Sequence, residues 1–241
     1  MKTHLDNAMS LLLLRHPQLP ESPQSLTPDE QAVYQRYLQS DPESPYLQLL
    51  SNPLEAIERA ATWPILEQAE IAALAIRCCP RRTPHNFANT LKGIMAFLCQ
   101  HKSDALLKKS LNVLAQSEPN VALAAILAIT TGSLRNRELE AASSLFAATH
   151  PQEALSALLQ LDDLDMRDSA LLNLADNWLT SDRQDVYHPQ SLLWALKAIS
   201  AISTGAIRKE VIAAIGKTVQ HLPPSELQSG AMALARDEER A

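Results

Sequence analysis

The chain has 241 residues and a net charge of −6, with 46% hydrophobic residues, 4% aromatic residues and only 5 glycines. Sheet proteins need β-branched and aromatic residues in their strands and glycine in their tight turns. This chain is instead rich in Leu and Ala, which favour helices, and its hydrophobic fraction excludes a disordered chain. We therefore expect an all-α protein whose length suits a repeat array.

The first part of the chain, residues 1–50, is predicted to be a cap made of N-terminal helices and a proline-rich linker. Residues 2–15 form a short helix, and the linker runs from Pro17 to Pro28. Thr27-Pro28-Asp29-Glu30 predicts a second helix start, with Thr27 as N-cap and Glu30 closing a capping box. This second helix should pack on the repeats through Val33, Tyr34, Tyr37 and Leu38. The first helix, which places Leu5, Met9, Leu12 and Leu13 at helical spacing, is either a second capping helix or a contact for another chain.

Residues 51–241 are predicted to form the repeat domain, in which proline marks the period. The prolines recur at intervals of 31 to 38 residues, at Pro53, Pro84, Pro119, Pro151, Pro189 and Pro224. Because proline is tolerated in the first helical turn, each of them should begin a helix. Apolar residues three, seven and ten positions later define one face of that helix. They are Ala56, Ala60, Trp63; Phe87, Leu91, Ile94; Ala122, Ile126, Ile129; Ala154, Leu158, Leu161; Leu192, Leu196, Ile199; and Leu227, Ala231, Leu234.

A second helix is expected before the next proline, with a pattern of its own. A large residue is followed three and four positions later by a large-small pair, and then by a further residue three positions on. The copies are Ile71, Leu74-Ala75, Cys78; Leu111, Leu114-Ala115, Glu118; Ser143, Phe146-Ala147, His150; Leu171, Leu174-Ala175, Trp178; and Ile212, Ile215-Gly216, Val219. Two such helices cannot bury their apolar faces alone, so the pairs should stack on one another.

This pattern resembles the tetratricopeptide repeat over roughly residues 53–235. Leu171, Leu174-Ala175 and Trp178 fit the first helix of that family, as do Ile212, Ile215-Gly216 and Val219, and Ala154, Leu158 and Leu161 fit its second helix. The resemblance implies an α-solenoid of tandem antiparallel helix pairs that binds a protein or peptide and has no catalytic activity. The period varies, and proline opens a helix here instead of following one, so a HEAT-like superhelix remains an alternative.

The resemblance also implies partner-binding residues, because the family lines its groove with one helix of each pair. The polar positions that would face the groove are Lys109, Asn112, Gln116, Asn173, Asp176, Glu210 and Lys217. Asn173 is the most suggestive, since an asparagine at the matching position binds peptide termini in some members of the family. A solvated helix face explains the same residues equally well.

An uneven distribution of charge gives an alternative function. Residues 77–137 carry a net charge of +7, between segments of −6 and −7. The basic stretch 77–109 contains Arg77, Arg81, Arg82, Lys92, Lys102, Lys108 and Lys109, and it could follow nucleic-acid phosphates. Stacking aromatics are lacking, because Phe87 and Phe97 have the pattern of core residues. The leading hypothesis is therefore an adaptor, scaffold or chaperone-like protein, and a nucleic-acid-binding helical repeat is the alternative.

No motif in the sequence predicts catalysis, a cofactor or a metal site. Asp162, Asp163, Asp165 and Asp168 lack the glycine turn and closing glutamate of a calcium loop, and acidic residues favour a helix N-terminus. Cys78, Cys79 and Cys99 suit a reducing compartment. The short apolar run near the N-terminus lacks the features of a signal peptide, and no segment approaches the length of a membrane span. We expect a cytoplasmic protein without enzymatic activity.

Overall fold

The computed structural model describes residues 4–16, 19, 25–40, 44–79, 84–180 and 189–218 of the chain, and these residues form helices and no strand. The predicted all-α class is therefore confirmed. The chain divides into two compact units, Met1–Thr131 and Gly132–Ala241. Among the described residues, no helix combines the length and the apolar composition needed to cross a membrane.

The first unit is built around α5. Its helices are α1 (His4–Arg15), α2 (Pro28–Ser40), α3 (Pro45–Ser51), α4 (Pro53–Arg59), the 3-10 turn η2 (Ala60–Thr62), α5 (Ile65–Arg77), α6 (Pro84–His101), α7 (Asp104–Ser117) and α8 (Pro119–Leu127). Helix α5 contacts α3, α4, α6, α7 and α8. Its residues 71–76 are all buried, as expected of a helix that neighbours cover on several sides.

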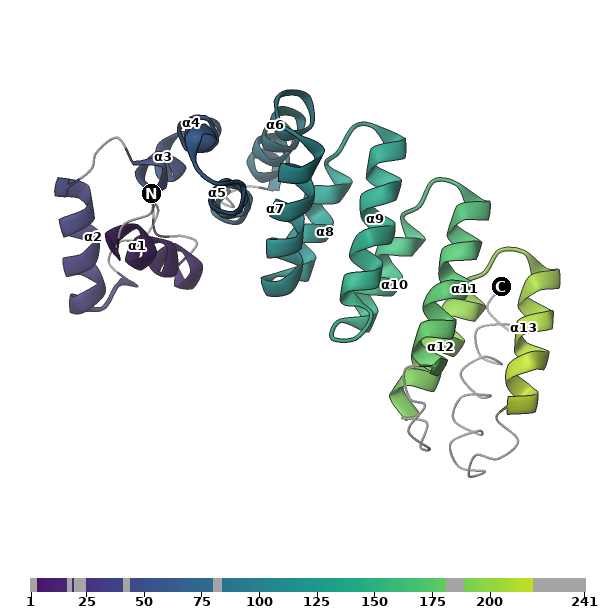
Figure 1. Cartoon of the computed structure of the whole chain (residues 1–241). Helices are drawn as coiled ribbons and strands as arrows, with labels where there is room; N and C mark the ends of the chain where they lie inside the picture. The colour runs from purple at the N-terminus through teal and green to yellow at the C-terminus, as the bar shows by residue number, and fades with distance from the viewer. Residues whose placement is uncertain are drawn as a thin grey trace. The chain divides into compact units, whose positions relative to one another are not determined.

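The second unit contains five described helices that contact their neighbours in a regular way. They are α9 (Gly132–Phe146), α10 (Pro151–Leu159), α11 (Leu164–Thr180), α12 (Pro189–Ser200) and α13 (Gly205–Thr218). Each helix packs against the next along the chain, and α9 also contacts α11 while α10 contacts α12. Figure 1 shows α9 and α11 side by side, with α10 and α12 behind them.

The structure confirms that the repeat prolines begin helices. Five of them are the first residues of α4, α6, α8, α10 and α12, where a missing N–H breaks no helical hydrogen bond; Pro224 lies outside the described residues. The predicted apolar positions after these five prolines are buried, except Trp63 and Phe87, which are half-buried. The second helix of each pair follows as α5, α7, α9, α11 and α13.

On α7 and α9 the copies of the pattern align one turn earlier than predicted, although most of the predicted positions are buried. These buried positions are Leu111, Leu114 and Ala115 of α7 and Ser143 and Phe146 of α9. Glu118 and His150 were placed on the apolar face of these helices, but they lie just after the helix ends and are half-buried. Burial places the pattern one turn earlier, at Leu107, Ser110-Leu111, Leu114 and at Leu139, Ala142-Ser143, Phe146. In this register α9 matches Leu171, Leu174-Ala175 and Trp178 of α11 at a constant spacing of 32 residues.

The N-terminal helices pack on the first pair by a different route from the predicted one. The capping box forms as predicted, with Thr27 N donating to Glu30 Oε2 at 3.0 Å. On α2, Tyr37 is buried, Val33 and Tyr34 are half-buried, and Leu38 is 38% exposed. Helix α2 packs on α1, whereas α3, which the sequence did not predict, packs on both α4 and α5.

Candidate functional site

The predicted groove residues fall into both units. Lys109 and Asn112 are half-buried and Gln116 is exposed on α7 of the first unit, whereas Asn173 and Asp176 are exposed on α11 of the second. Lys109 and Asn173 are 64 residues apart, and so are Asn112 and Asp176. This separation is twice the 32-residue spacing between matching positions of α9 and α11, so the two residues of each pair occupy equivalent positions on their helices. The side chains of Glu210 and Lys217 lie outside the described residues.

The predicted basic patch is partly neutralised within the chain. Arg77 Nη2 lies 2.8 Å from Glu118 Oε1, and only 14% of the arginine side chain is exposed. Lys102 Nζ lies 5.6 Å from the centroid of the Phe97 ring, a cation–π contact. Lys92 and Lys108 are exposed and Lys109 is half-buried; Arg81 and Arg82 lie outside the described residues.

The acidic cluster at the start of α11 makes structural contacts within the second unit. Asp162 pairs with Arg135, and Asp163 Oδ1 accepts a hydrogen bond from Met166 N at 3.0 Å, which caps α11. Asp168 is 3% exposed and caps α13, because it accepts bonds from Ser203 N at 2.9 Å and Thr204 N at 3.0 Å. Burial opposes ionisation of Asp168, but the backbone and hydroxyl donors hold its pKa below the ordinary value.

No metal-binding geometry was found in the described ranges, which hold no group of three or more His, Cys, Asp or Glu side chains positioned for an ion.

The first unit has a cleft between α1 and α2. The cleft has a volume of about 220 Å³ and is lined by Ala8, Leu11, Leu12, Arg15, Asp29, Glu30 and Val33. Leu11 at this cleft is 56% exposed. The cleft is therefore apolar along most of its length and carries charged groups where α1 ends and α2 begins.

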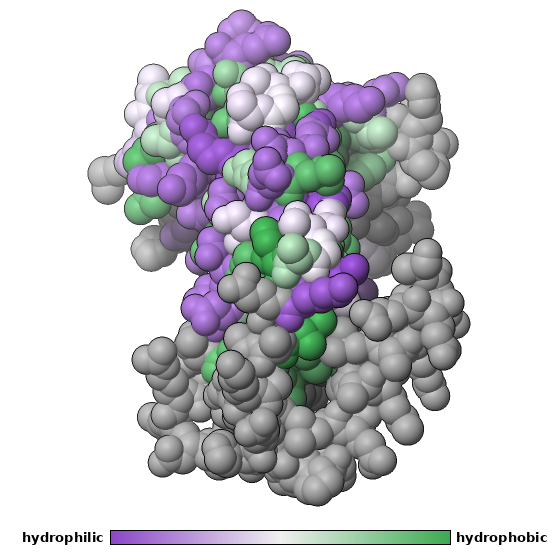
Figure 2. Space-filling view, turned by 90° about the vertical axis from the view of Figure 1, so that its right-hand side faces the viewer, coloured by the Kyte–Doolittle hydropathy of each residue, from purple (hydrophilic) through white to green (hydrophobic). Residues whose placement is uncertain are grey.

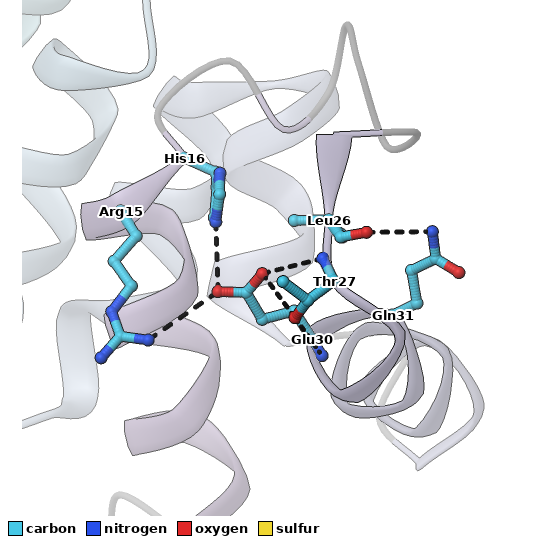
Figure 3. Close-up of polar contacts among 6 residues, drawn as sticks. All are labelled: Arg15, His16, Leu26, Thr27, Glu30 and Gln31. Carbon is cyan, nitrogen blue, oxygen red and sulfur yellow. Dashed lines mark hydrogen bonds and ion pairs between the residues drawn. The ribbon is translucent and has the colours of Figure 1, made fainter.

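Figure 3 shows how Glu30 organises the charged end of this cleft. Its carboxylate accepts the backbone N–H and the hydroxyl of Thr27, at 3.0 and 2.9 Å. His16 Nε2 and Arg15 Nη1 approach it from the end of α1, at 3.2 and 3.8 Å. The backbone hydrogen bond from Thr27, followed by the contacts of His16 and the Thr27 hydroxyl, lowers the pKa of Glu30 to about 2. Glu30 thus joins α1 to α2 as well as capping its own helix.

A buried polar cluster holds α1 against the rest of the first unit. Tyr37 is 1% exposed, and its hydroxyl donates to Asp6 Oδ1 of α1 at 2.7 Å. Ser10, one turn after Asp6, donates to Glu70 of α5, whose Oε1 lies 3.5 Å from the Tyr46 hydroxyl. Burial and the nearby carboxylates raise the pKa of Tyr46. The cluster therefore has the satisfied polar contacts of a structural core.

The surface seen in Figure 2 has a mixed character. Hydrophilic residues are interspersed with smaller groups of apolar ones over the described part of that face. Among the described residues, the exposed large apolar side chains outside the cleft are Leu38, Leu66, Val113, Leu127, Leu145, Leu159 and Leu164. Of these, Leu66 at the start of α5 is 68% exposed, the largest value among them.

Comparison with known proteins assigns no family. The chain matches no protein-family model, no curated protein and no solved structure.

Two features of the surface were not predicted from the sequence. One is the exposed apolar segment at the start of α5, which includes Trp63 and Leu66. Its apolar residues have no spacing that distinguishes them from those of an ordinary helix start. The other is the pair of arginines, Arg135 and Arg167, that reach from α9 and α11 to later loops. Their 32-residue spacing was visible in the sequence, but the wrong register on α9 concealed it.

Proposed function

We propose that this chain is a helical-repeat protein that binds a protein or peptide partner on exposed faces of its helices, acts in the cytoplasm and has no enzymatic role. Its architecture would be an α-solenoid of tandem antiparallel helix pairs, of the tetratricopeptide-like or HEAT-like kind. Cys78 and Cys79 are buried free thiols, which suits a reducing compartment.

The observation that carries the proposal is a contact repeated between successive helix pairs. Arg135 of α9 reaches Asp162, and Arg167 of α11 reaches Ser203. The two arginines are 32 residues apart, and each partner lies two residues before the next helix of the same layer begins, at Leu164 and Gly205. Equivalent residues thus make equivalent contacts, which supports a stacked array of similar units.

The same register indicates where a partner would bind. Leu139 and Phe146 of α9 and their counterparts on α11, Leu171 and Trp178, are buried. Asn173 and Asp176 of α11 lie on the exposed face of the same helix. Trp178 Nε1 donates to Ala147 O at 2.7 Å, which fixes α11 against the end of α9. A rigid helix with a solvated polar row, here including Asn173, is the kind of surface on which repeat proteins bind their partners.

The nucleic-acid alternative has weaker support. Phosphate binding needs cations free to replace counterions, yet Arg77 is paired with Glu118. The net charge of the whole chain is −6, so most of the molecule would repel phosphate.

An affinity capture from native host extract tests the proposal. The baits are the wild-type chain, Asn173→Lys on α11, and Gln152→Lys, an equal charge change at an exposed position of α10. We expect a protein that is captured by the wild type and by Gln152→Lys, and lost with Asn173→Lys. Capture of nucleic acid alone, or an identical set of proteins with all three baits, would contradict this role for α11. Circular dichroism and melting curves confirm that the three baits are equally folded.

A further inference from the structure

The turn between α4 and α5 presents apolar side chains to solvent. We call residues 61–67 the α4–α5 corner; Figure 1 shows its place between these two helices. Leu66 is 68% exposed, Ala61 and Pro64 are also exposed, and Trp63 and Ile65 are half-buried. An exposed cluster of contiguous apolar residues in a folded protein usually marks an interaction site.

Specific contacts hold the backbone of this corner in place. Gln68 Nε2 donates to Trp63 O at 2.6 Å and to Ala61 O at 3.2 Å. The Trp63 ring packs against the buried Tyr46, with their centroids 6.1 Å apart. The apolar side chains are therefore presented by a preorganised turn, which lowers the entropy that a partner must overcome on binding.

A carboxylate without a partner lies next to these apolar side chains. In the described part of the chain, Glu67 Oε2 is shielded from solvent and has no hydrogen-bond partner. Leu66 and Glu67 are consecutive residues in the first turn of α5, and Trp63 directly precedes Pro64, the N-cap of that helix. A carboxylate that has lost part of its hydration gains more from an incoming cation than a fully hydrated one does.

The sequence explains why Glu67 has no partner. It is three residues after the N-cap of α5, the position at which Glu30 of α2 closes a capping box with Thr27. The N-cap of α5 is Pro64, which has no N–H to donate, so the same box cannot form. Residues 52–76 carry four glutamates and a single cation, Arg59, and Arg59 pairs with Glu55 at 2.7 Å.

We propose that the α4–α5 corner binds a segment of a partner protein in which an apolar side chain stands next to a Lys or Arg. The apolar side chain packs on Leu66 and Trp63, and the cation pairs with Glu67. This inference rests on the proposed protein-binding function and adds to it a surface and a partner chemistry distinct from the polar row on α11.

Selection from a random peptide library displayed on phage, with the full chain as target, tests this inference. Enriched peptides are synthesised, and their binding is measured by fluorescence anisotropy. Three variants are compared with the wild type: Leu66→Asp, Glu67→Gln, and Leu159→Asp as a control at another exposed leucine, 42% exposed. We expect Lys or Arg next to a large apolar residue in the enriched peptides. Binding should fall about tenfold or more in Leu66→Asp, fall less in Glu67→Gln, weaken with salt, and stay unchanged in the control.

Other outcomes would overturn the inference. They are the absence of enrichment, enriched peptides without the cationic–apolar pair, or peptide binding that neither corner variant weakens. Light scattering tests one more such outcome. If the chain self-associates and Leu66→Asp abolishes this, the corner binds a second copy of the chain and not a different protein. Because Asn173→Lys leaves the corner intact, failure here and failure of the α11 surface are distinguishable.

Discussion

At the residue scale, Leu174 tests the predicted buried face of α11. It is 4% exposed and lies on α11 between Leu171 and Trp178, which are also buried. Replacing a buried leucine with alanine removes apolar contact and leaves a cavity. We expect Leu174→Ala to lower the free energy of unfolding by about 2–5 kcal/mol, measured by urea denaturation.

Leu164 of the same helix provides the matched control, because it is 55% exposed. Leu164→Ala should change the free energy of unfolding by less than about 0.5 kcal/mol, as surface substitutions do. Equal losses in the two variants would show that the assigned faces of α11 are wrong.

Glu30 gives a prediction of pH dependence. Its pKa in the folded chain is lowered from 4.5 to about 2, so the ionised carboxylate stabilises the fold. This contribution is fully present above pH 4.5 and is lost as the pH falls from there toward about 2. We expect Glu30→Gln to lower the urea midpoint at pH 7, and the difference from wild type to shrink steadily below pH 4.5.

Asp29→Asn serves as the control for that experiment, since it removes a neighbouring exposed carboxylate that takes no part in the contacts of Figure 3. A difference between wild type and Glu30→Gln that stayed constant from pH 7 to pH 3 would mean that the ionised form of Glu30 does not stabilise α2.

At the element scale, α1 is predicted to stabilise the first unit. Its Met9, Leu12 and Leu13 are buried, and Asp6 accepts the Tyr37 hydroxyl. Deleting residues 1–26 would expose these apolar contacts of α2 and α3 and remove one of the hydrogen-bond partners of the Tyr37 hydroxyl, leaving Ser44. We expect a large drop in the melting temperature, measured by calorimetry. An unchanged melting temperature with a change in oligomeric state, seen by light scattering, would instead assign α1 to a contact between chains.

The helices also show how much of the fold can be predicted from the sequence. Proline tolerance in the first helical turn is a local property, so the starts of five helices could be placed from single residues. Helix α3 was missed because it has only seven residues and proline on both sides, too short for a periodic signal. The error on α7 and α9 has another cause: in a helix rich in Leu and Ala, a shift of one turn preserves the pattern, and only burial against neighbours selects the register.

At the scale of the whole molecule, contacts between residues far apart in the sequence determine which charged side chains are paired, and the sequence alone did not predict these contacts. Arg77 had the appearance of a free cation in a basic stretch, but its partner, Glu118, lies 41 residues later. Glu67 Oε2 lacks a partner because Pro64 has no N–H to donate and because Arg59, the single cation of residues 52–76, pairs with Glu55. Both are visible in hindsight, yet neither forms a motif, so the sequence pointed to polar helix faces and gave no sign of the α4–α5 corner.

Nucleic-acid binding by the intact chain provides the last prediction. Arg77 is paired with Glu118 and Lys102 lies over the Phe97 ring, so two of the seven cations of the basic stretch are engaged within the chain, whose net charge is −6. We therefore expect only weak binding to mixed-sequence DNA and RNA, and a shallow dependence of affinity on salt, in anisotropy titrations at low and physiological ionic strength. A protein that neutralises 6–10 phosphates would lose roughly 10³–10⁵ in affinity over a comparable range. Tight binding with such a slope, reduced by Lys92→Glu and Lys108→Glu but not by Lys197→Glu, would contradict the protein-binding proposal and support the nucleic-acid alternative.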